Sequence, residues 1–557
     1  MHATPFHPRP TARARGRART STALLAAALA LPAPALAANR TFAINSLIIP
    51  MQVEYQEDEA IIDAYGLVYT ILRHNPERVA ALKRPVTFYW IIAPNKLSAY
   101  RCNTNTSTLP SYATLNDNDG CDFVVQRATG RPVALLNPDN TEQSPFDVYA
   151  SAYTPSGGPA RGNLVAVGGS RKVMKYLGGA FVVDAADRQA FFEMLTDYAS
   201  ELAQYRSATT NPNYVKIHSA RISFTAPVLR KLNARPPLIA VANTAGASFL
   251  TDVLLQAGLG VLQSPWSQTP PNGTVFEYVD PATFLNSDAT YPRGLINSGR
   301  YGLLWVPDGG IAVDAAQLAN LTWFVDFGSG LYVEANSLES VENSGALYHT
   351  STGVNVLNPN IPYFDDCNDR GLSGGSFYRS NRTGDCFVYG GLSQPYAQTG
   401  NFAFEGGQGN YKGFNALSGF LTGVDQVLRI SGKETLTSAR YKDNDLSKGM
   451  VFYMAGHKFA NARYWGQRLI MNSVIGNVPL AVPVELSRSE PVGYVDKSGS
   501  QPANHVYQGT YVQLPDPVSP DVDTYNPLAP QRWQFPFIQG HLYEYDLASI
   551  STAAAGQ

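Results

Sequence analysis

The fold is decided by the segment Gly330–Glu342, which reads GLYVEANSLESVE. It predicts a buried strand that runs sharply into a helix. A turn of this kind can hold a thiolate or an alkoxide above the edge of a sheet, beside backbone N–H donors. The position that a nucleophile would take is Ala335, and a methyl group cannot act as one. The segment therefore predicts an α/β fold of the enzyme kind that lacks the group on which catalysis would depend.

Strand and helix patterns alternate on both sides of this segment. Short β-branched and aromatic runs predict strands, and longer runs with apolar residues at helical spacing predict helices. Pro236 and Pro237 resist both helix and central strand, so we expect a domain to begin there. Such alternation is typical of a mainly parallel sheet. The strands are expected at 238–242, 301–307 and 449–455, and the helices at 248–257, 314–327 and 462–475.

The residues before this boundary predict another α/β unit. A strand at 42–50, a helix at 60–74 and a strand at 86–92 favour a parallel β-α-β unit. The expected fold class is α/β, with flavodoxin-like, mainly parallel sheets in two tandem units and a β-rich tail. The expected divisions are a signal peptide at 1–37, an N-terminal α/β domain at 38–235, a second α/β domain at 236–480 with an insertion at about 343–425, and the tail at 481–557.

Two stretches of the second domain resemble a known superfamily. Residues 301–342 resemble class I glutamine-amidotransferase-like domains, in which a strand, a Pro-x-Gly-Gly turn, a helix, a Gly-rich break and an elbow strand follow one another. The stretch KGMVFYMAGH at 448–457 is similar to the corresponding strand of ThuA-like members. In active members a Cys acts with a His and a carboxylate. With Ala335 at the Cys position, the resemblance implies a fold without that hydrolysis, and the superfamily includes many non-enzymatic relatives.

Three polar residues are candidates for binding a ligand in this domain. His457 follows a predicted strand on the side where open α/β sheets gather their ligands. Glu334 and Ser337 flank Ala335. Structural alternatives stay open, since His457 can cap the next turn and Glu334 can be a polar group that faces solvent. No catalytic residue is assigned.

Two acidic stretches resemble oxygen-rich calcium loops. Neither supplies the complete set of an EF-hand, which needs a carboxylate at its twelfth position. Turn chemistry explains the same residues, because Asp and Asn satisfy their own backbone in tight turns. Both interpretations stay open, and no other cofactor is expected. The candidate calcium ligands are Asp117, Asp119, Asp122, Asp443 and Asp445.

The cysteines form two pairs with equal spacing. Cys102 and Cys121 flank one polar loop, and Cys367 and Cys386 flank another. Local pairing would close loops of about 20 residues, which is worth roughly 3 kcal/mol for each bridge. Neither pair has the short spacing of a zinc site. We expect two local disulfides and therefore an oxidising destination.

The first residues predict an export signal. An arginine-rich stretch at 9–19 precedes an apolar run at 21–33 that is too short to span a bilayer. Ala35-Leu36-Ala37 then supplies a cleavage pattern. We expect cleavage there, a secreted, periplasmic or cell-surface location in a bacterium, and no transmembrane segment in the mature chain. The net charge of −2 lacks the basic field that binds nucleic acid, so no nucleic-acid partner is expected.

The tail carries a second resemblance. Residues 533–547 end in GHLYEYDL, which is similar to the "G-H-L-x-x-Y/F-D" phrase of PilY-type adhesins that accompany type IV pili. It implies that the chain is the amino-terminal portion of a longer, propeller-containing protein; the alternative is a β-hairpin tail facing solvent. The favoured function is a non-catalytic secreted protein of the cell surface, linked to adhesion or type IV pilus biogenesis, with envelope or pilus partners. The alternative is a secreted hydrolase or sugar-active enzyme centred on His457, Glu334 and Ser337.

Overall fold

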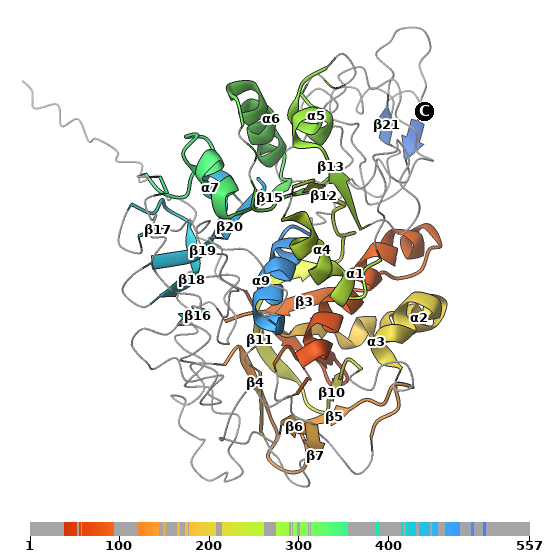
Figure 1. Ribbon diagram of the computed structural model, residues 1–557. Helices are drawn as coiled ribbons and strands as arrows, with labels where there is room; N and C mark the ends of the chain where they lie inside the picture. Colours follow the sequence, from red (N-terminus) through yellow and green to blue (C-terminus); the bar gives the residue numbers. More distant parts are fainter. Residues whose placement is uncertain are drawn as a thin grey trace, which may run out of the picture. The chain divides into compact units, whose positions relative to one another are not determined.

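The computed structural model describes the greater part of 38–93, 121–143, 173–207, 214–260, 275–354 and 419–478, and isolated strands at 149–151, 164–166, 386–388, 414–415, 492–494 and 505–507. These residues form two large sheets and three small ones (Figure 1). The fold class is mixed α/β, as predicted. Within these ranges no helix is both long enough and apolar enough to cross a membrane. The expected signal peptide at 1–37 lies outside them.

The first large sheet is antiparallel throughout. Its strands are β1 (Ala38–Phe42), β2 (Leu47–Ile49), β3 (Phe88–Ile91), β5 (Val133–Leu135), β9 (Phe181–Val183), β10 (His218–Ala220) and β11 (Phe224–Leu232). They pair in the order β1-β11-β3-β9-β2-β10-β5. One face packs on α1 (Asp58–Ala80), α2 (Arg188–Asp197) and α3 (Ala199–Arg206).

The predicted parallel β-α-β unit at the start of the chain is wrong. The strands on either side of α1, β2 and β3, do not pair with each other. β9 lies between them and runs antiparallel to both. The unit β2-α1-β3 is therefore split, and β9-α2-α3-β10 completes the β-α-β-β-α-β order of the ferredoxin-like motif.

The prediction of a parallel β-α-β unit failed because this antiparallel sheet is covered on both faces. Helices cover one face, and the small pair β4 (Phe123–Gln126) and β8 (Val173–Tyr176) covers the other, with the rings of Phe123 and Phe224 stacked at 5.2 Å. Strands buried on both faces are continuous apolar runs, which usually mark parallel strands. Each residue of β2, β3 and β9 is buried. A separate small pair joins β6 (Tyr149–Ser151) to β7 (Leu164–Ala166).

The second large sheet contains the parallel strands. They are β12 (Ile239–Ala242), β13 (Phe276–Val279), β14 (Leu303–Val306), β15 (Gly330–Glu334) and β20 (Met450–Met454). Their order is β13-β12-β14-β15-β20, all parallel. The sheet continues antiparallel through β19 (Glu434–Tyr441), β18 (Asp425–Ile430) and β16 (Cys386–Val388), with β17 (Phe414–Asn415) beside β19. Part of the expected insertion at 343–425 thus extends the sheet.

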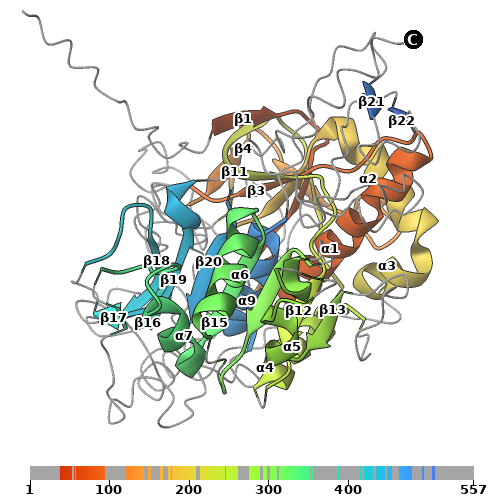
Figure 2. The same cartoon turned by 90° about the horizontal axis from the view of Figure 1, so that it is seen from above.

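Helices cover both faces of the parallel strands (Figure 2). On one face lie α4 (Ala247–Gln256) and α9 (Arg463–Gly476). On the other lie α5 (Pro281–Leu285), α6 (Ala315–Asp326) and α7 (Ala335–Glu342). Asp314 begins α6 through a capping box with Gln317, in which each side chain accepts the other residue's backbone N–H. A mainly parallel sheet was predicted here; the five strands from β13 to β20 are parallel, whereas the pairings from β20 through β19 and β18 to β16, and that of β17 with β19, are antiparallel, so the sheet is mixed.

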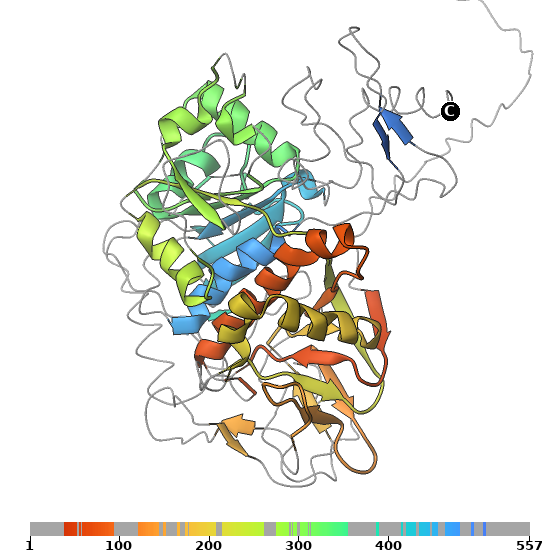
Figure 3. The ribbon, with the colours of Figure 1, turned by 90° about the vertical axis from the view of Figure 1, so that its right-hand side faces the viewer.

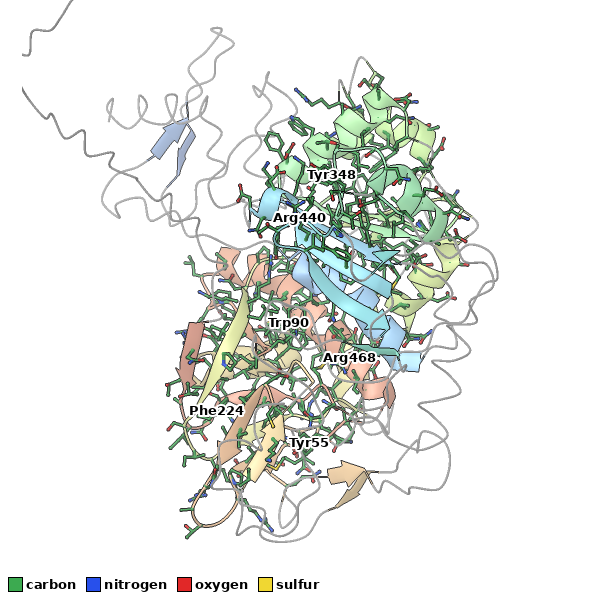
Figure 4. All side chains as sticks on the ribbon, turned by 90° about the vertical axis from the view of Figure 1, so that its left-hand side faces the viewer. Tyr55, Trp90, Phe224, Tyr348, Arg440 and Arg468 are labelled. Atoms are coloured by element: carbon green, nitrogen blue, oxygen red, sulfur yellow. The ribbon has the colours of Figure 1, made fainter. Side chains whose placement is uncertain are left out.

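The two sheets share one hydrophobic core. Helix α1 of the first sheet packs with α9 and α4 of the second (Figure 1). The Tyr65 hydroxyl in α1 donates to Asn472 Oδ1 in α9 at 2.7 Å. Arg468 of α9 donates to the carbonyl of Gly178, which precedes β9 (Figure 4). The layer between the sheets is therefore built from both halves of the chain.

The tail contains one short antiparallel pair among its described residues. β21 (Val492–Tyr494) pairs with β22 (His505–Tyr507), drawn in dark blue in Figure 3. The stretch at 533–547, on which the resemblance to PilY-type adhesins rests, lies outside the described residues.

Candidate functional site

The predicted sharp turn from strand to helix is confirmed. β15 is buried at each of its residues and ends at Glu334, and α7 begins at Ala335. The φ angle of Ala335 is 43°, in the left-handed region that residues with a Cβ rarely adopt. Strain of this kind is characteristic of turns that present a nucleophile. The residues 334–337 are called the elbow below.

The elbow has no nucleophile at Ala335, and the backbone donor that follows this position is occupied. Ala335 is completely buried, so its methyl group packs inside the turn. The backbone N–H of Asn336 donates to Asp308 Oδ1 at 3.3 Å. In catalytic elbows the N–H that follows the nucleophile helps to bind the oxyanion of the reaction. Here a carboxylate takes that position, and it would repel a second anion.

The elbow lies beside the carboxyl ends of β12 and β14. The Thr244 hydroxyl, after β12, donates to the backbone carbonyl of Asp308, after β14, at 3.0 Å. A Cβ on Gly246 would lie 2.9 Å from the same carbonyl oxygen, so the two loops are in close contact. The chain connections leave in opposite directions from these two strands, and open α/β sheets bind ligands at such points.

Glu334 is a buried carboxyl group that is only half satisfied. Its Oε1 accepts a hydrogen bond from the Tyr332 hydroxyl at 2.8 Å, and its Oε2 has no partner among the described residues. Burial raises the pKa of Glu334 to about 8, although hydrogen bonds from Tyr332 and the Asp308 backbone oppose the shift. The group is therefore mostly neutral at pH 7. The alternative in which Glu334 faces solvent is wrong, since it is 1% exposed.

A second unsatisfied polar group lies on the same face of the sheet. Trp305 pairs in register with Tyr332, and Glu334 follows two residues later on the strand. The indole Nε1 of Trp305 is buried and has no partner among the described residues. A neutral carboxyl and an indole N–H can bind a water molecule or an uncharged polar group, as unsatisfied buried atoms usually do.

Ser337 holds the elbow to the neighbouring loop. Its hydroxyl is fully buried and donates to the carbonyl of Pro307 at 2.7 Å. The proton that a nucleophilic serine would give to a base is thus already engaged by a backbone oxygen. This contact gives Ser337 a structural role, and ligand binding by it remains a prediction.

We expect Ser337→Ala to lower the free energy of unfolding by about 1–3 kcal/mol, because the buried carbonyl of Pro307 would lose its donor. Urea titration measures the change. Ser200→Ala is the control: Ser200 is exposed on α3, and its replacement should alter stability by less than about 0.5 kcal/mol. Equal stability of Ser337→Ala and the wild type would contradict the structural role.

The other predicted site residues are not brought to the elbow. His457, Asp117, Asp119, Cys102 and Cys367 lie outside the described residues. Cys386 begins β16, and Cys121 is buried. The two disulfides therefore stay a prediction, as does any role of His457.

The described calcium candidates have other partners. Asp122 accepts the backbone N–H groups of Ala93 at 3.0 Å and of Gly179 at 2.8 Å. Asp443 pairs with Lys448 and Lys442, and the hydrogen bond from Lys448 is the main cause of its lowered pKa. Asp445 ends the short turn that follows β19. In the part of the chain that the structure describes, no three acidic, His or Cys side chains gather as metal ligands would.

Sequence reasoning missed a buried serine–histidine pair. Ser438 Oγ and His349 Nδ1 lie 2.7 Å apart, but both residues are at most 1% exposed. Glu342 accepts the backbone N–H of His349 at 2.6 Å rather than its ring. Burial lowers the pKa of His349 well below its usual value, and Arg440, which donates to Tyr348 O at 3.2 Å (Figure 4), adds to this. The pair joins β19 to the segment after α7 and is closed to substrates.

Asp308 was also missed as a site residue. The sequence pattern could have indicated this residue, because Asp308 lies in the Pro-x-Gly-Gly turn and directly follows a predicted strand. Tyr332 and Trp305 gave no such signal, because aromatic residues in a buried strand are expected core.

Comparisons with known proteins leave the family open. A scan of the chain against protein-family models finds no match, and a search of curated proteins finds none. Among solved structures, a cytoplasmic protein from Salmonella typhimurium is similar over 43% of this chain and 97% of its own, with 10% identity and a TM-score of 0.23. A likeness at that level carries no argument about fold or function.

Proposed function

We propose that this chain is a secreted, non-catalytic protein of the bacterial cell surface, linked to adhesion or type IV pilus biogenesis. The observation that carries the non-catalytic part is the elbow. Ala335 takes the nucleophile position in a strained turn, and the N–H of Asn336 is occupied by the Asp308 carboxylate. Such a turn keeps the shape of a catalytic site without its chemistry.

The strand order supports an amidotransferase-like origin for the second sheet. Numbered along the chain, its parallel strands lie in the order 2-1-3-4-5, which is the flavodoxin-like order. A doubly wound sheet with an elbow after its fourth strand is what the resemblance of residues 301–342 implies. This supports a degenerate class I glutamine-amidotransferase-like, ThuA-like domain as the framework. The export signal expected at 1–37 and the phrase GHLYEYDL in the tail support a place at the cell surface.

A pull-down tests the proposed partners. The chain from Ala38 is tagged and incubated with a bacterial envelope extract, and co-purifying proteins are identified by mass spectrometry. We expect pilins or minor pilins to be enriched over a tagged periplasmic control protein. A matched version that ends at residue 480 lacks the tail, and we expect it to recover less of them. No enrichment of pilus proteins by either version would contradict the pilus link.

One observation favours the alternative of a hydrolase or sugar-active enzyme. A carboxyl with a raised pKa, Glu334, lies near a second carboxylate, Asp308, whose charge contributes to raising it. Glycosidases use such pairs, with the neutral member as general acid. Turnover of ester or glycoside substrates that Glu334→Gln abolishes would favour this alternative. The non-catalytic proposal expects no turnover by either protein.

A further inference from the structure

The first sheet ends in an exposed strand, β1. All five residues of β1 pair with β11 in continuous register, and β1 has no second neighbour among the described residues. In Figure 2, β1 runs along the outer side of that sheet. At the opposite edge β5 is partly covered, because the backbone N–H of Gln143 donates to the carbonyl of Leu135 at 2.8 Å. Strand β1 is therefore the open edge of the sheet.

Two contacts show which backbone groups of β1 face away from the sheet. The hydroxyls of Thr41 and Thr225, which lie opposite each other, are 2.9 Å apart. Opposite side chains come closest in non-hydrogen-bonded pairs, whose N–H and C=O groups point away from the partner strand. Asn39, two residues away, belongs to the same set, and it lies opposite Pro227, which has no N–H to donate. The N–H and C=O groups of Asn39 and Thr41 therefore point to the open edge.

This edge lacks the usual devices that block the addition of a strand, such as a proline, a bulge or a charge that projects along the edge. Strand β1 contains no Pro, and its register with β11 has no shift. Its one charged side chain, Arg40, is held on its own chain, 4.4 Å from the centroid of the Tyr89 ring and 2.7 Å from Asp184 Oδ2. Asn39, Arg40 and Thr41 are exposed. The edge can therefore accept another strand through its main chain.

We propose that β1 pairs with β1 of a second copy of this chain, antiparallel and about a two-fold axis at Thr41. Thr41 would then lie opposite the second copy's Thr41, Asn39 opposite Ala43, and Arg40 opposite Phe42. The N–H and C=O groups that point to the open edge would bond to those of the second copy, and the first sheets of the two copies would join into one. This inference does not depend on the elbow or on the proposed function.

Charge favours this register over its neighbour. An axis at Arg40 would place the two Arg40 side chains opposite each other, and like charges in that position destabilise a sheet. With the axis at Thr41, Arg40 lies opposite the second copy's Phe42, which repeats the contact within one chain, where the guanidinium is 5.6 Å from the Phe42 ring centroid. The contact between Thr41 and Thr225 would continue across the axis as a row of threonines, and such pairs stabilise sheets. The edge is therefore self-complementary, as a two-fold interface requires.

Sedimentation velocity of the full chain, without an amino-terminal tag, tests the proposal. Because so short an edge buries less than the roughly 1,200–2,000 Å² of a stable interface, we expect a weak, reversible dimer at about 10–100 µM. Thr41→Pro should weaken the dimer by at least about tenfold, since it removes an N–H that points to the open edge and none that bonds to β11. Thr41→Val is the matched control, because it keeps this N–H, and it should still dimerise.

Two results of this experiment would overturn the proposal. A chain that stays monomeric up to about 100 µM would do so, and it would leave the edge to a strand of another protein. A folded Thr41→Pro protein, with an unchanged circular dichroism spectrum, that dimerises as strongly as the wild type would show that the contact lies elsewhere.

A second pair of variants keeps the test valid if Thr41→Pro fails to fold. With the axis at Thr41, Thr41→Cys brings the two introduced thiols opposite each other, where Cα atoms about 5.5 Å apart are within the range of a disulfide. Asn39→Cys lies opposite Ala43 and is the control. Under mild oxidation we expect a covalent dimer of Thr41→Cys alone, with the link between the two positions 41 identified by mass spectrometry. No link in Thr41→Cys, or an equal amount of covalent dimer in Asn39→Cys, would overturn the proposal.

Discussion

Glu334→Gln is expected to remove most of a pH-dependent loss of stability between pH 5 and pH 8. In the wild type the pKa of Glu334 is raised from 4.5 to about 8 by burial, so the native state holds this proton more tightly than the unfolded chain does. The stability that the neutral form supplies is complete below about pH 4.5, and it is lost as the pH rises through about 8. For one such group the loss between pH 5 and pH 8 is roughly 3–4 kcal/mol.

Glutamine keeps the shape of the neutral carboxyl and cannot ionise. Relative to the wild type, the variant should therefore gain stability steadily from pH 5 to pH 8, as measured by urea unfolding at each pH. Glu339→Gln is the matched control: it lies half-buried on α7, next to the elbow, and should follow the wild type across the range. If the stability of Glu334→Gln changes with pH in the same way as that of the wild type, the conclusion that Glu334 is buried in its neutral form is wrong.

Gly66→Ala is expected to destabilise the protein by at least about 3 kcal/mol, the upper part of the range for overpacking. A Cβ at Gly66 of α1 would lie 1.8 Å from the carbonyl oxygen of Ala257, at the end of α4, and 2.8 Å from the Tyr205 ring in α3. The Tyr205 hydroxyl donates to that same carbonyl at 2.9 Å, which holds it in place. The gain in helix propensity from Gly to Ala, about 1 kcal/mol, is smaller than this cost.

Urea unfolding measures the effect of Gly66→Ala, and Gly260→Ala provides the comparison. A Cβ at Gly260 would meet nothing within 4 Å, so its replacement should change stability by less than about 0.5 kcal/mol. Because Gly66 lies where α1 meets helices of both halves, the variant also tests whether the sheets unfold together. A Gly66→Ala protein as stable as the wild type would show that these helices can separate without cost.

The buried Glu334 also bears on how the elbow is to be understood. A nucleophilic elbow stores backbone strain in order to present a reactive atom. Here the strain at Ala335 persists with no reactive atom to present, while the adjacent carboxyl stays neutral and the neighbouring N–H binds Asp308. Tertiary contacts hold the turn, among them the hydrogen bonds from Ser337 to Pro307 and from Asn336 to Asp308. This state supports the non-catalytic role that we propose for the chain.

Local elements of the second sheet were predictable from sequence. The strand expected at 238–242 is β12 (Ile239–Ala242), and the helix expected at 314–327 is α6 (Ala315–Asp326). The helix expected at 248–257 is α4 (Ala247–Gln256). These predictions succeeded because apolar spacing, caps and prolines act within a few residues of chain, and that information is local.

The alternation of strands and helices, the turn at Ala335 and the missing nucleophile there could all be predicted from the residues in chain order. Three features follow from the tertiary structure alone: β9 lies between β2 and β3, Glu334 is buried with an oxygen that has no partner among the described residues, and Arg78 is buried beside Glu193 and Asp197. Each of these depends on which distant segments become neighbours. Strand order, desolvation and charge pairing are set by those neighbours, and no spacing along the chain records them.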